Sequence, residues 1–256
     1  MPDSSLVERA ASRAPLTGTF LTLPGATAAE LLAEPFDLVA IDLEHGALGP
    51  LDAQEMVLGA QAAGAYALVR LPADAHGLMA TMLDAGADGV LLADVAHPQT
   101  AAAAVARVTH PPDGTRGWGP RRLTLRRRGS GVPARPALWV QIESAAGVAR
   151  AAEIAAVPGV DALVVGTADL SFALGTPLDT HTPELLAAVT AVRAAATGAG
   201  VVFGVAGALD VAPPAVLAGA NLLMHGTDAR LCALAVDSAA LWLRSAFNID
   251  QETPLS

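Results

Sequence analysis

Cysteine is almost absent from the sequence, since Cys232 is the only one. One thiol excludes an intramolecular disulfide framework and offers no cysteine-based metal pattern, and its place in a helical stretch favours a buried structural thiol. Aromatic residues are also scarce, at 4%, whereas apolar residues make up 53%. We therefore expect a core of Ala, Val and Leu, which suits helices packed closely on a parallel sheet buried on both faces.

Excess positive charge and long apolar runs are lacking as well. The formal net charge is −10, which argues against general nucleic-acid affinity. No apolar run approaches the roughly 20 residues of a membrane-spanning helix, and the best candidate, residues 231–243, is interrupted by Asp237. Residues 1–13 carry charges and serines where a signal peptide would have its apolar segment. These absences predict a soluble, cytoplasmic protein that binds neither nucleic acid nor membranes.

What the sequence has in abundance is an alternation of short apolar runs with alanine-rich helical stretches. A series of eight such pairs over 256 residues favours one closed (β/α)₈ (TIM) barrel. The expected strands cover residues 18–23, 38–42, 65–71, 89–93, 137–143, 162–166, 201–205 and 221–224. The expected helices cover residues 28–33, 52–63, 77–85, 100–108, 145–156, 183–196, 214–218 and 229–247. We expect a single barrel domain over residues 1–256, with flexible ends at 1–15 and 250–256.

One segment departs from this alternation of strands and helices. Residues 110–136 are rich in Pro, Gly and Arg and show little periodicity. A loop of this length inside a compact domain is usually functional or disordered.

Polar residues lie at or just after the ends of several predicted strands, namely Asp42, Arg70, Gln141, Glu143 and Asp169. In a barrel of this kind, catalytic groups lie where strands end and βα loops begin. Glu143 and Asp169 end neighbouring strands, so their carboxylates can converge and hold a hard cation such as Mg²⁺ or Mn²⁺. The alternative for each is a carboxylate that merely favours a helix N-terminus. Without a cysteine or a His-x-x-x-His spacing, a tetrahedral zinc site is not expected.

Arg70 and His45 each allow two interpretations. Arg70 ends an apolar strand and either clamps a substrate carboxylate or forms a structural ion pair with a strand-end acid. His45 lies three residues after Asp42, and it is either a general base oriented by that carboxylate or a structural histidine. The small residues Gly166-Thr167-Ala168 either bring backbone N–H groups close to an anion or simply form a tight turn.

Taken together, these residues resemble the HpcH/HpaI aldolase family. Its members are metal-dependent class II pyruvate aldolases that cleave substrates such as 4-hydroxy-2-oxoheptanedioate or 2-keto-3-deoxy sugar acids. The similarity extends from about residue 18 to about residue 247. The matching stretches are residues 36–46 (ending Ile-Asp-Leu-Glu-His-Gly), 69–70, 83–87, 111–117, 140–143 and 166–171.

The resemblance implies a role for each of these residues. It assigns Glu143 and Asp169 to a divalent metal (Mg²⁺, Mn²⁺ or Co²⁺), and His45, supported by Asp42, to the base. It assigns to substrate binding the residues Arg70, Gln141, Gly166, Thr167, Ala168, Asp84 and Arg116. Asp84 in relatives lies near a neighbouring subunit's site. The family is commonly hexameric, which implies a homo-oligomer, either a hexamer or another trimer-based assembly, with the last helix exchanged between partners.

The reaction implied by the resemblance is cleavage or formation of a 4-hydroxy-2-oxo acid. The metal chelates the 2-oxo acid, the His45-linked base takes the C4 hydroxyl proton, and the C3–C4 bond breaks to give an aldehyde and a pyruvate enolate. The metal and Arg70 stabilise the developing charge. No lysine ends a strand, so a Schiff-base aldolase is disfavoured.

Two stretches depart from the family pattern. The fourth strand ends Leu92-Ala93-Asp94-Val95, where relatives usually have a Val-Pro-like ending, and the glycine loop continues into Arg121-Arg122 and Arg126-Arg127-Arg128. The loop arginines either form a solvated or subunit-contact surface or select an acidic or phosphorylated acceptor. Alternatives for the reaction are therefore citrate-synthase-like condensation, oxaloacetate decarboxylation with addition, or a metabolite-binding protein without turnover.

Overall fold

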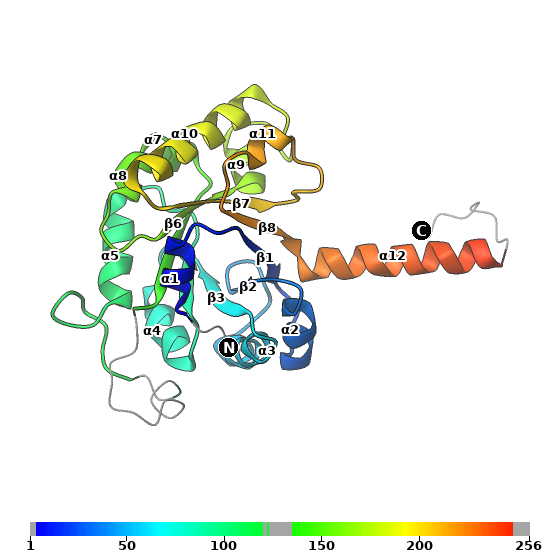
Figure 1. Ribbon diagram of the computed structural model, residues 1–256, viewed down its shortest axis with the longest axis horizontal. Helices are drawn as coiled ribbons and strands as arrows, with labels where there is room; N and C mark the ends of the chain where they lie inside the picture. Colours follow the sequence, from blue (N-terminus) through cyan, green and yellow to red (C-terminus); the bar gives the residue numbers. More distant parts are fainter. Residues whose placement is uncertain (1–3, 120–121, 123–134, 248–256) are drawn as a thin grey trace.

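A computed structural model describes residues 4–119, 122 and 135–247. Eight parallel strands form a closed barrel in the order of the sequence, β1 to β8, and β8 pairs with β1. Helices follow the strands and surround the barrel (Figure 1). This architecture confirms the predicted (β/α)₈ fold.

The strands lie close to the predicted ranges. Their bounds are β1 Leu16–Leu21, β2 Leu38–Asp42, β3 Tyr66–Leu71, β4 Gly89–Leu92, β5 Ala137–Ile142, β6 Ala162–Gly166, β7 Val202–Gly207 and β8 Leu222–Thr227. The helices are α1 Leu6–Ala11, α2 Ala26–Ala33, α3 Pro50–Ala62, α4 His76–Ala85, α5 Pro98–Val108, α7 Ala145–Ala149, α8 Ala151–Ala155, α9 Thr167–Ala173, α10 Pro183–Ala199, α11 Pro214–Leu217 and α12 Asp228–Ala246.

Two apolar clusters hold the barrel together, one on each side of the strands. Side chains that point inward fill the barrel, with Trp139 fully buried among them. Side chains that point outward pack against alanine-rich faces of the helices. This division follows from the alternation of side chains along a strand, and small alanines allow the helices to approach the sheet closely. The core therefore agrees with the scarcity of aromatic residues.

The N-terminal end of the chain contains a helix that the sequence pattern did not reveal. Within residues 1–15, where a flexible end was expected, α1 begins at the N-cap Ser5, whose hydroxyl accepts the N–H of Glu8. Leu6 and Ala10 are buried in the same cluster as the barrel interior. Because β1 begins at Leu16, α1 covers the amino end of the barrel, opposite the ends where catalytic groups are expected.

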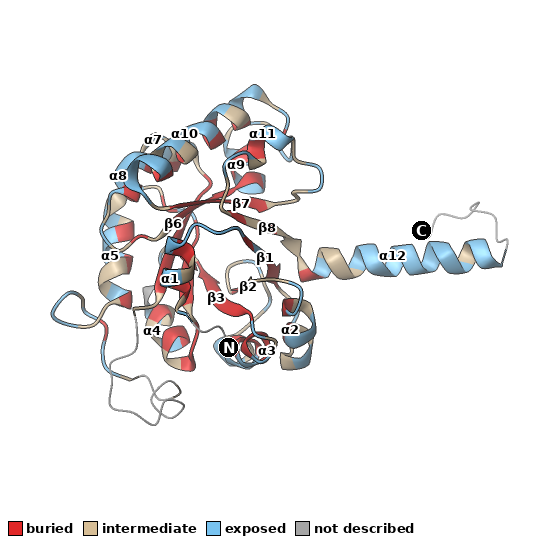
Figure 2. Ribbon diagram, viewed as in Figure 1, coloured by how far each residue is buried: buried red, intermediate tan, exposed pale blue. Residues whose placement is uncertain are grey.

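The last helix, α12, extends away from the barrel instead of covering it (Figures 1 and 2). Its first residue, Asp228, is fully buried, whereas the rest of the helix is half-buried or exposed. Within the described parts of the chain, no helix is long and apolar enough to cross a membrane. The predicted flexible residues 250–256 lie outside the described residues.

Candidate active site

The polar residues predicted at the strand ends take inward-facing positions. Leu38 and Ala40 of β2 pack inside the barrel, and Asp42 continues this alternation two residues further on. On β3, Arg70 follows the interior residue Leu68 in the same way. The register places Asp42 directly opposite Arg70 on the neighbouring strand. Both side chains therefore enter the barrel at the carboxyl ends of the strands.

Arg70 is held by two acidic side chains and an aromatic ring. Its Nε and Nη2 donate to the two carboxylate oxygens of Asp42 at 2.9 and 2.5 Å. Its Nη1 lies 3.4 Å from Glu44 Oε2, and its Cζ lies 4.5 Å from the ring centroid of Phe20. The ion pair with a strand-end acid, expected as one interpretation of Arg70, is thus present.

Both members of this ion pair are charged. Burial would raise the pKa of Asp42, but the hydrogen bonds and charge of Arg70 outweigh it and lower that pKa below its usual range. Burial would likewise lower the pKa of Arg70, but the carboxylates of Asp42 and Glu44 raise it. Arg70 therefore remains a fixed cation, although only 8% of its side chain is exposed.

His45 has a different neighbour from the one predicted. Asp42 was expected to support the His45 ring, but its Oδ1 accepts the backbone N–H groups of Glu44 and His45 at 3.0 and 3.2 Å. The carboxylate near the ring is that of Glu44, whose Oε2 lies 3.8 Å from His45 Nε2. The side chain of His45 is 61% exposed. Asp42 thus orients Arg70 and the turn after β2, while the imidazole stays accessible.

Glu143 is a buried carboxyl group with one unsatisfied oxygen. It directly follows β5 and is 6% exposed. Its Oε1 accepts the backbone N–H of Asp94 at 2.8 Å, whereas Oε2 is buried without a hydrogen-bond partner among the described residues. Burial raises the pKa of Glu143 to about 8, the N–H of Asp94 opposes this, and the charges of Glu44 and Asp169 add to it. A buried carboxyl group of this kind is stabilised either by a proton or by a bound cation.

A cavity of about 230 Å³ opens at the carboxyl ends of the strands. His45, Arg70, Gln141 and residues 166–169 all line it. A Cβ atom at Gly166 would clash with Glu143 Oε2 and Gln141 Nε2, so both side chains lie directly against this glycine. The structure thus brings most of the predicted site residues to one place.

The donor set fits a hard divalent cation. Glu143 Oε2 and Gln141 Oε1 are buried without a hydrogen-bond partner among the described residues, and the exposed carboxylate of Asp169 lines the same cavity. Oxygen ligands of this kind suit Mg²⁺ or Mn²⁺, which usually keep water or substrate oxygens in the remaining positions. Among the described residues, no cluster of three or more His, Cys, Asp or Glu side chains is suited to a metal. A site with two carboxylates would therefore leave positions open for a substrate.

Asp84 and Arg116 lie elsewhere in the chain. Asp84 is near the end of α4, Arg116 follows α5, and Arg116 Nη2 donates to Asp84 Oδ1 at 2.6 Å. Helices of the barrel end at the amino ends of the strands, opposite the cavity. Within one chain, neither residue lines the cavity, so the roles of Asp84 and Arg116 in substrate binding stay predictions. Arg121 and Arg126–Arg128 lie outside the described residues, and Arg122 Nη1 donates to the backbone oxygen of Ala85 at 3.0 Å.

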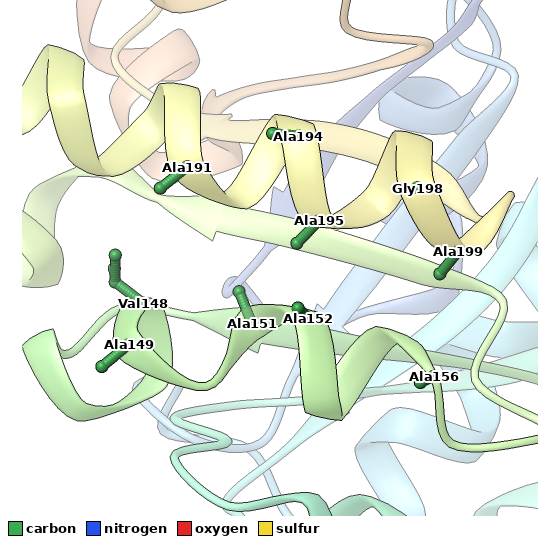
Figure 3. A pocket seen from close by; sticks show the side chains of 10 residues that line it. All are labelled: Val148, Ala149, Ala151, Ala152, Ala156, Ala191, Ala194, Ala195, Gly198 and Ala199. Atoms are coloured by element: carbon green, nitrogen blue, oxygen red, sulfur yellow. The ribbon is translucent and has the colours of Figure 1, made fainter.

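A larger hollow of about 570 Å³ lies between α7, α8 and α10 (Figure 3). It is lined by alanines together with Val148 and Gly198. These side chains carry no group that could transfer a proton or bind a metal, so the hollow offers no chemistry.

Three residues near the cavity escaped the sequence analysis. Glu44 was quoted only as part of a motif, although it faces both Arg70 and His45. Phe20 and Arg230 line the cavity. Glu44 could have been recognised as a site residue by its position two residues after Asp42. Arg230 could have been recognised by its position just after the last strand.

Comparisons with known proteins identify the family to which the chain is similar. A family model described as HpcH/HpaI aldolase/citrate lyase matches residues 17–235. The chain is 35% identical over 214 residues to a hydroxypyruvate/pyruvate aldolase from Paraburkholderia phytofirmans, which covers 77% of this chain and 80% of that protein. It is 34% identical over 242 residues to a 4-hydroxy-2-oxovalerate aldolase from Rhodococcus jostii, covering 90% and 91% of the two chains.

A solved structure gives the same result. The crystal structure of an HpcH/HpaI aldolase/citrate lyase family protein from Burkholderia cenocepacia matches with a TM-score of 0.83 and 34% identity. The match covers 93% of this chain and 98% of that one. This chain is therefore a carbon–carbon lyase, and it belongs to the HpcH/HpaI aldolase/citrate lyase family.

Proposed function

We propose that the protein is a divalent-metal-dependent aldolase. It would cleave a 4-hydroxy-2-oxo acid into an aldehyde and pyruvate or a related 2-oxo acid, or form the 4-hydroxy-2-oxo acid from these two compounds. The observation that carries this proposal is the buried Glu143 carboxyl group, whose Oε2 lacks a hydrogen-bond partner among the described residues beside a cavity that contains a fixed cation, Arg70.

Glu143 and Asp169 are the residues that would hold the metal, with the Gln141 oxygen close by. Bound there, a Mg²⁺ or Mn²⁺ ion supplies Lewis-acid polarisation of the substrate's keto group. Binding of a cation by Glu143 is favourable, because burial and neighbouring negative charge raise the pKa of this carboxyl group to about 8.

Arg70 provides permanent positive charge on the substrate side. Asp42 and Glu44 keep its guanidinium ionised and oriented, and the side chain lines the cavity. Its remaining N–H groups can bind the 2-oxo acid and stabilise the negative charge that develops on the enolate oxygen. The ion pair with Asp42 therefore keeps Arg70 in the charged and oriented state that binding of the substrate requires.

His45 is the proposed general base. In the cleavage direction, it takes the proton from the C4 hydroxyl, the C3–C4 bond breaks, and the bonding electrons form the C2–C3 double bond of the enolate. The aldehyde leaves, and a proton delivered to C3 then gives the 2-oxo acid. Glu44, close to His45 Nε2, would stabilise the protonated imidazole. Schiff-base chemistry is not available to this sequence because it contains no lysine.

We further propose that the chain acts as a homo-oligomer in which α12 packs on a partner. The helix carries large apolar side chains that are exposed in the single chain, namely Leu234, Val236, Leu241, Trp242 and Leu243. Its extension from the barrel leaves these side chains available to another subunit (Figure 2). Light scattering should give a multiple of the 25.7 kDa chain mass. Trp242→Arg should shift this mass downward, whereas Glu153→Arg, at an exposed position of α8, should not.

Pyruvate deuteration tests the proposed function. In D₂O, EDTA-treated protein should leave the methyl protons of pyruvate unchanged, and added Mn²⁺ should start their exchange, which NMR detects. Addition of an aldehyde should then give the 4-hydroxy-2-oxo acid, and a parallel reaction with oxaloacetate would reveal decarboxylation or condensation by product mass. Exchange that is absent with every divalent ion, or that persists in EDTA, contradicts the proposal.

A further inference from the structure

The turn after β4 contains a residue with an unfavourable backbone conformation. Asp94 has a φ of 42°, and among the described residues that are not glycine only Arg13 and Leu178 also have a positive φ. The Cβ atom makes this left-handed conformation costly, although Asp and Asn tolerate it better than most residue types. Backbone strain of this kind concentrates at functional sites. Asp94 contacts Glu143, so the strained turn belongs to the candidate active site.

The positive φ directs two consecutive backbone N–H groups towards β5. Ala93, just after β4, donates its N–H in the other direction, to β3 at 2.9 Å. The N–H of Asp94 donates to Glu143 Oε1 at 2.8 Å, and the N–H of Val95 donates to the backbone oxygen of Gln141 at 3.0 Å. In an extended strand, successive N–H groups alternate in direction, so the N–H of Val95 would return to the β3 side. The left-handed residue therefore lets both groups hold the end of β5 that carries the site.

Only the backbone of Asp94 takes part in this arrangement. Its side chain is exposed and makes no hydrogen bond or ion pair with another described residue. Relatives usually have a Val-Pro-like ending on this strand, and a proline has no N–H to donate and cannot adopt a positive φ. The contact between Asp94 and Glu143 is therefore a feature of this sequence that the family pattern does not imply.

The hydrogen bond from Asp94 decides which oxygen of Glu143 is available. Oε1 accepts the N–H of Asp94, whereas Oε2 is buried without a hydrogen-bond partner among the described residues. Oε2 lies against Gly166, where a Cβ atom would clash with it, and Gly166 lines the cavity. The carboxyl group of Glu143 thus presents one oxygen towards the cavity.

We propose that Asp94 is a positioning residue whose left-handed backbone fixes Glu143 as a metal ligand with a single oxygen. This inference rests on the proposed metal-dependent function and names the device that orients one of its two carboxylates. Mg²⁺ requires nearly octahedral coordination, so a carboxylate restricted to one oxygen leaves more positions for substrate and water. Mutation of a group that orients a metal ligand typically weakens metal binding ten- to a hundredfold.

The Mn²⁺ affinity of four Asp94 variants, measured by electron paramagnetic resonance, tests the inference. The affinity should follow the tolerance of each residue type for a positive φ and not its charge. Asp94→Gly and Asp94→Asn should bind Mn²⁺ as tightly as the wild type. Asp94→Val, which introduces a β-branched side chain, should lose roughly ten- to a hundredfold in affinity. Asp94→Ala should show a smaller loss, and it provides the comparison if circular dichroism shows that the valine variant does not fold.

Arg13→Val is the matched control, because Arg13 has a φ of 54° and precedes β1 at the opposite end of the barrel. It should lower the free energy of unfolding in urea and leave the Mn²⁺ affinity unchanged. Equal losses of affinity in the asparagine, glycine and valine variants at position 94 would assign the effect to charge and overturn the inference. Wild-type affinity in folded Asp94→Val and Asp94→Ala, or weaker binding in Arg13→Val, would also overturn it. These outcomes leave the proposed function intact, whereas a wild-type protein that binds no Mn²⁺ would refute both.

Discussion

Replacing Glu143 by glutamine keeps the shape of the side chain and removes its ability to ionise. The amide oxygen can still accept the N–H of Asp94, as Glu143 Oε1 does at 2.8 Å. In the metal-free protein, the wild-type carboxyl group should be a source of instability, because its pKa is raised from 4.5 to about 8 when the chain folds. Glutamine should relieve this instability and, at the same time, abolish binding of the metal.

The magnitude follows from proton linkage. Below about pH 4.5 the carboxyl group is protonated in both states, so it does not affect the free energy of unfolding. Between pH 4.5 and about 8 only the folded state holds the proton, so stability falls by about 1.4 kcal/mol for each pH unit. At pH 7 the interval is 7 − 4.5 = 2.5 units, which gives an upper limit of about 3 kcal/mol. Water that enters the site reduces this value.

Urea denaturation in EDTA at fixed protein concentration measures the effect. Metal-free Glu143→Gln should be more stable than wild type at pH 7 by up to about 3 kcal/mol, and the difference should vanish near pH 4.5. Added Mn²⁺ should stabilise only the wild type. Glu153→Gln, at an exposed position of α8, should show none of these changes. A metal-free Glu143→Gln variant that is less stable at every pH would refute the reasoning.

Other substitutions test the rest of the site. Asp42→Asn removes the two-point ion pair of Arg70 and leaves only the longer contact with Glu44, so it should destabilise the protein by roughly 3–5 kcal/mol at pH 7. Because the pKa of Asp42 is lowered, this difference should shrink as pH falls below about 3.8; urea denaturation that finds the same difference at pH 3 would argue against the assignment. Arg70→Lys loses the two-point contact with Asp42 and should weaken pyruvate binding about tenfold or more by calorimetry, and unchanged affinity would remove this residue from the site. Gly166→Ala should displace the Glu143 carboxylate and weaken Mn²⁺ binding while the circular dichroism spectrum stays the same; wild-type affinity would count against the placement of Glu143.

The barrel and the position of its site could be predicted because both depend on simple periodicities. Strands buried on both faces appear as short apolar runs, and the polar residue after each run must lie at the same rim of the barrel. Asp42, Arg70, Gln141 and Glu143 were found in this way. The period of two residues along a strand then turns these side chains inward.

The pairing of side chains could not be predicted. Asp42 and His45 are near in sequence, but Asp42 faces Arg70, because strand register decides which groups meet inside a barrel. Arg116 was assigned to substrate binding from the family resemblance, and within one chain it follows a helix and lies at the rim opposite the cavity, so this assignment stays a prediction. Local signals would have improved the helix starts, since α3 and α5 begin at Pro50 and Pro98, the residue type favoured in the first turn.

The most direct test of the central claim is a Mn²⁺ titration followed by electron paramagnetic resonance. We expect one ion per chain in the wild type, with higher affinity when pyruvate is present, and a loss of roughly a hundredfold or more in Glu143→Gln and in Asp169→Asn. Wild-type affinity in both variants, or binding that pyruvate does not change, would contradict the assignment of these two carboxylates.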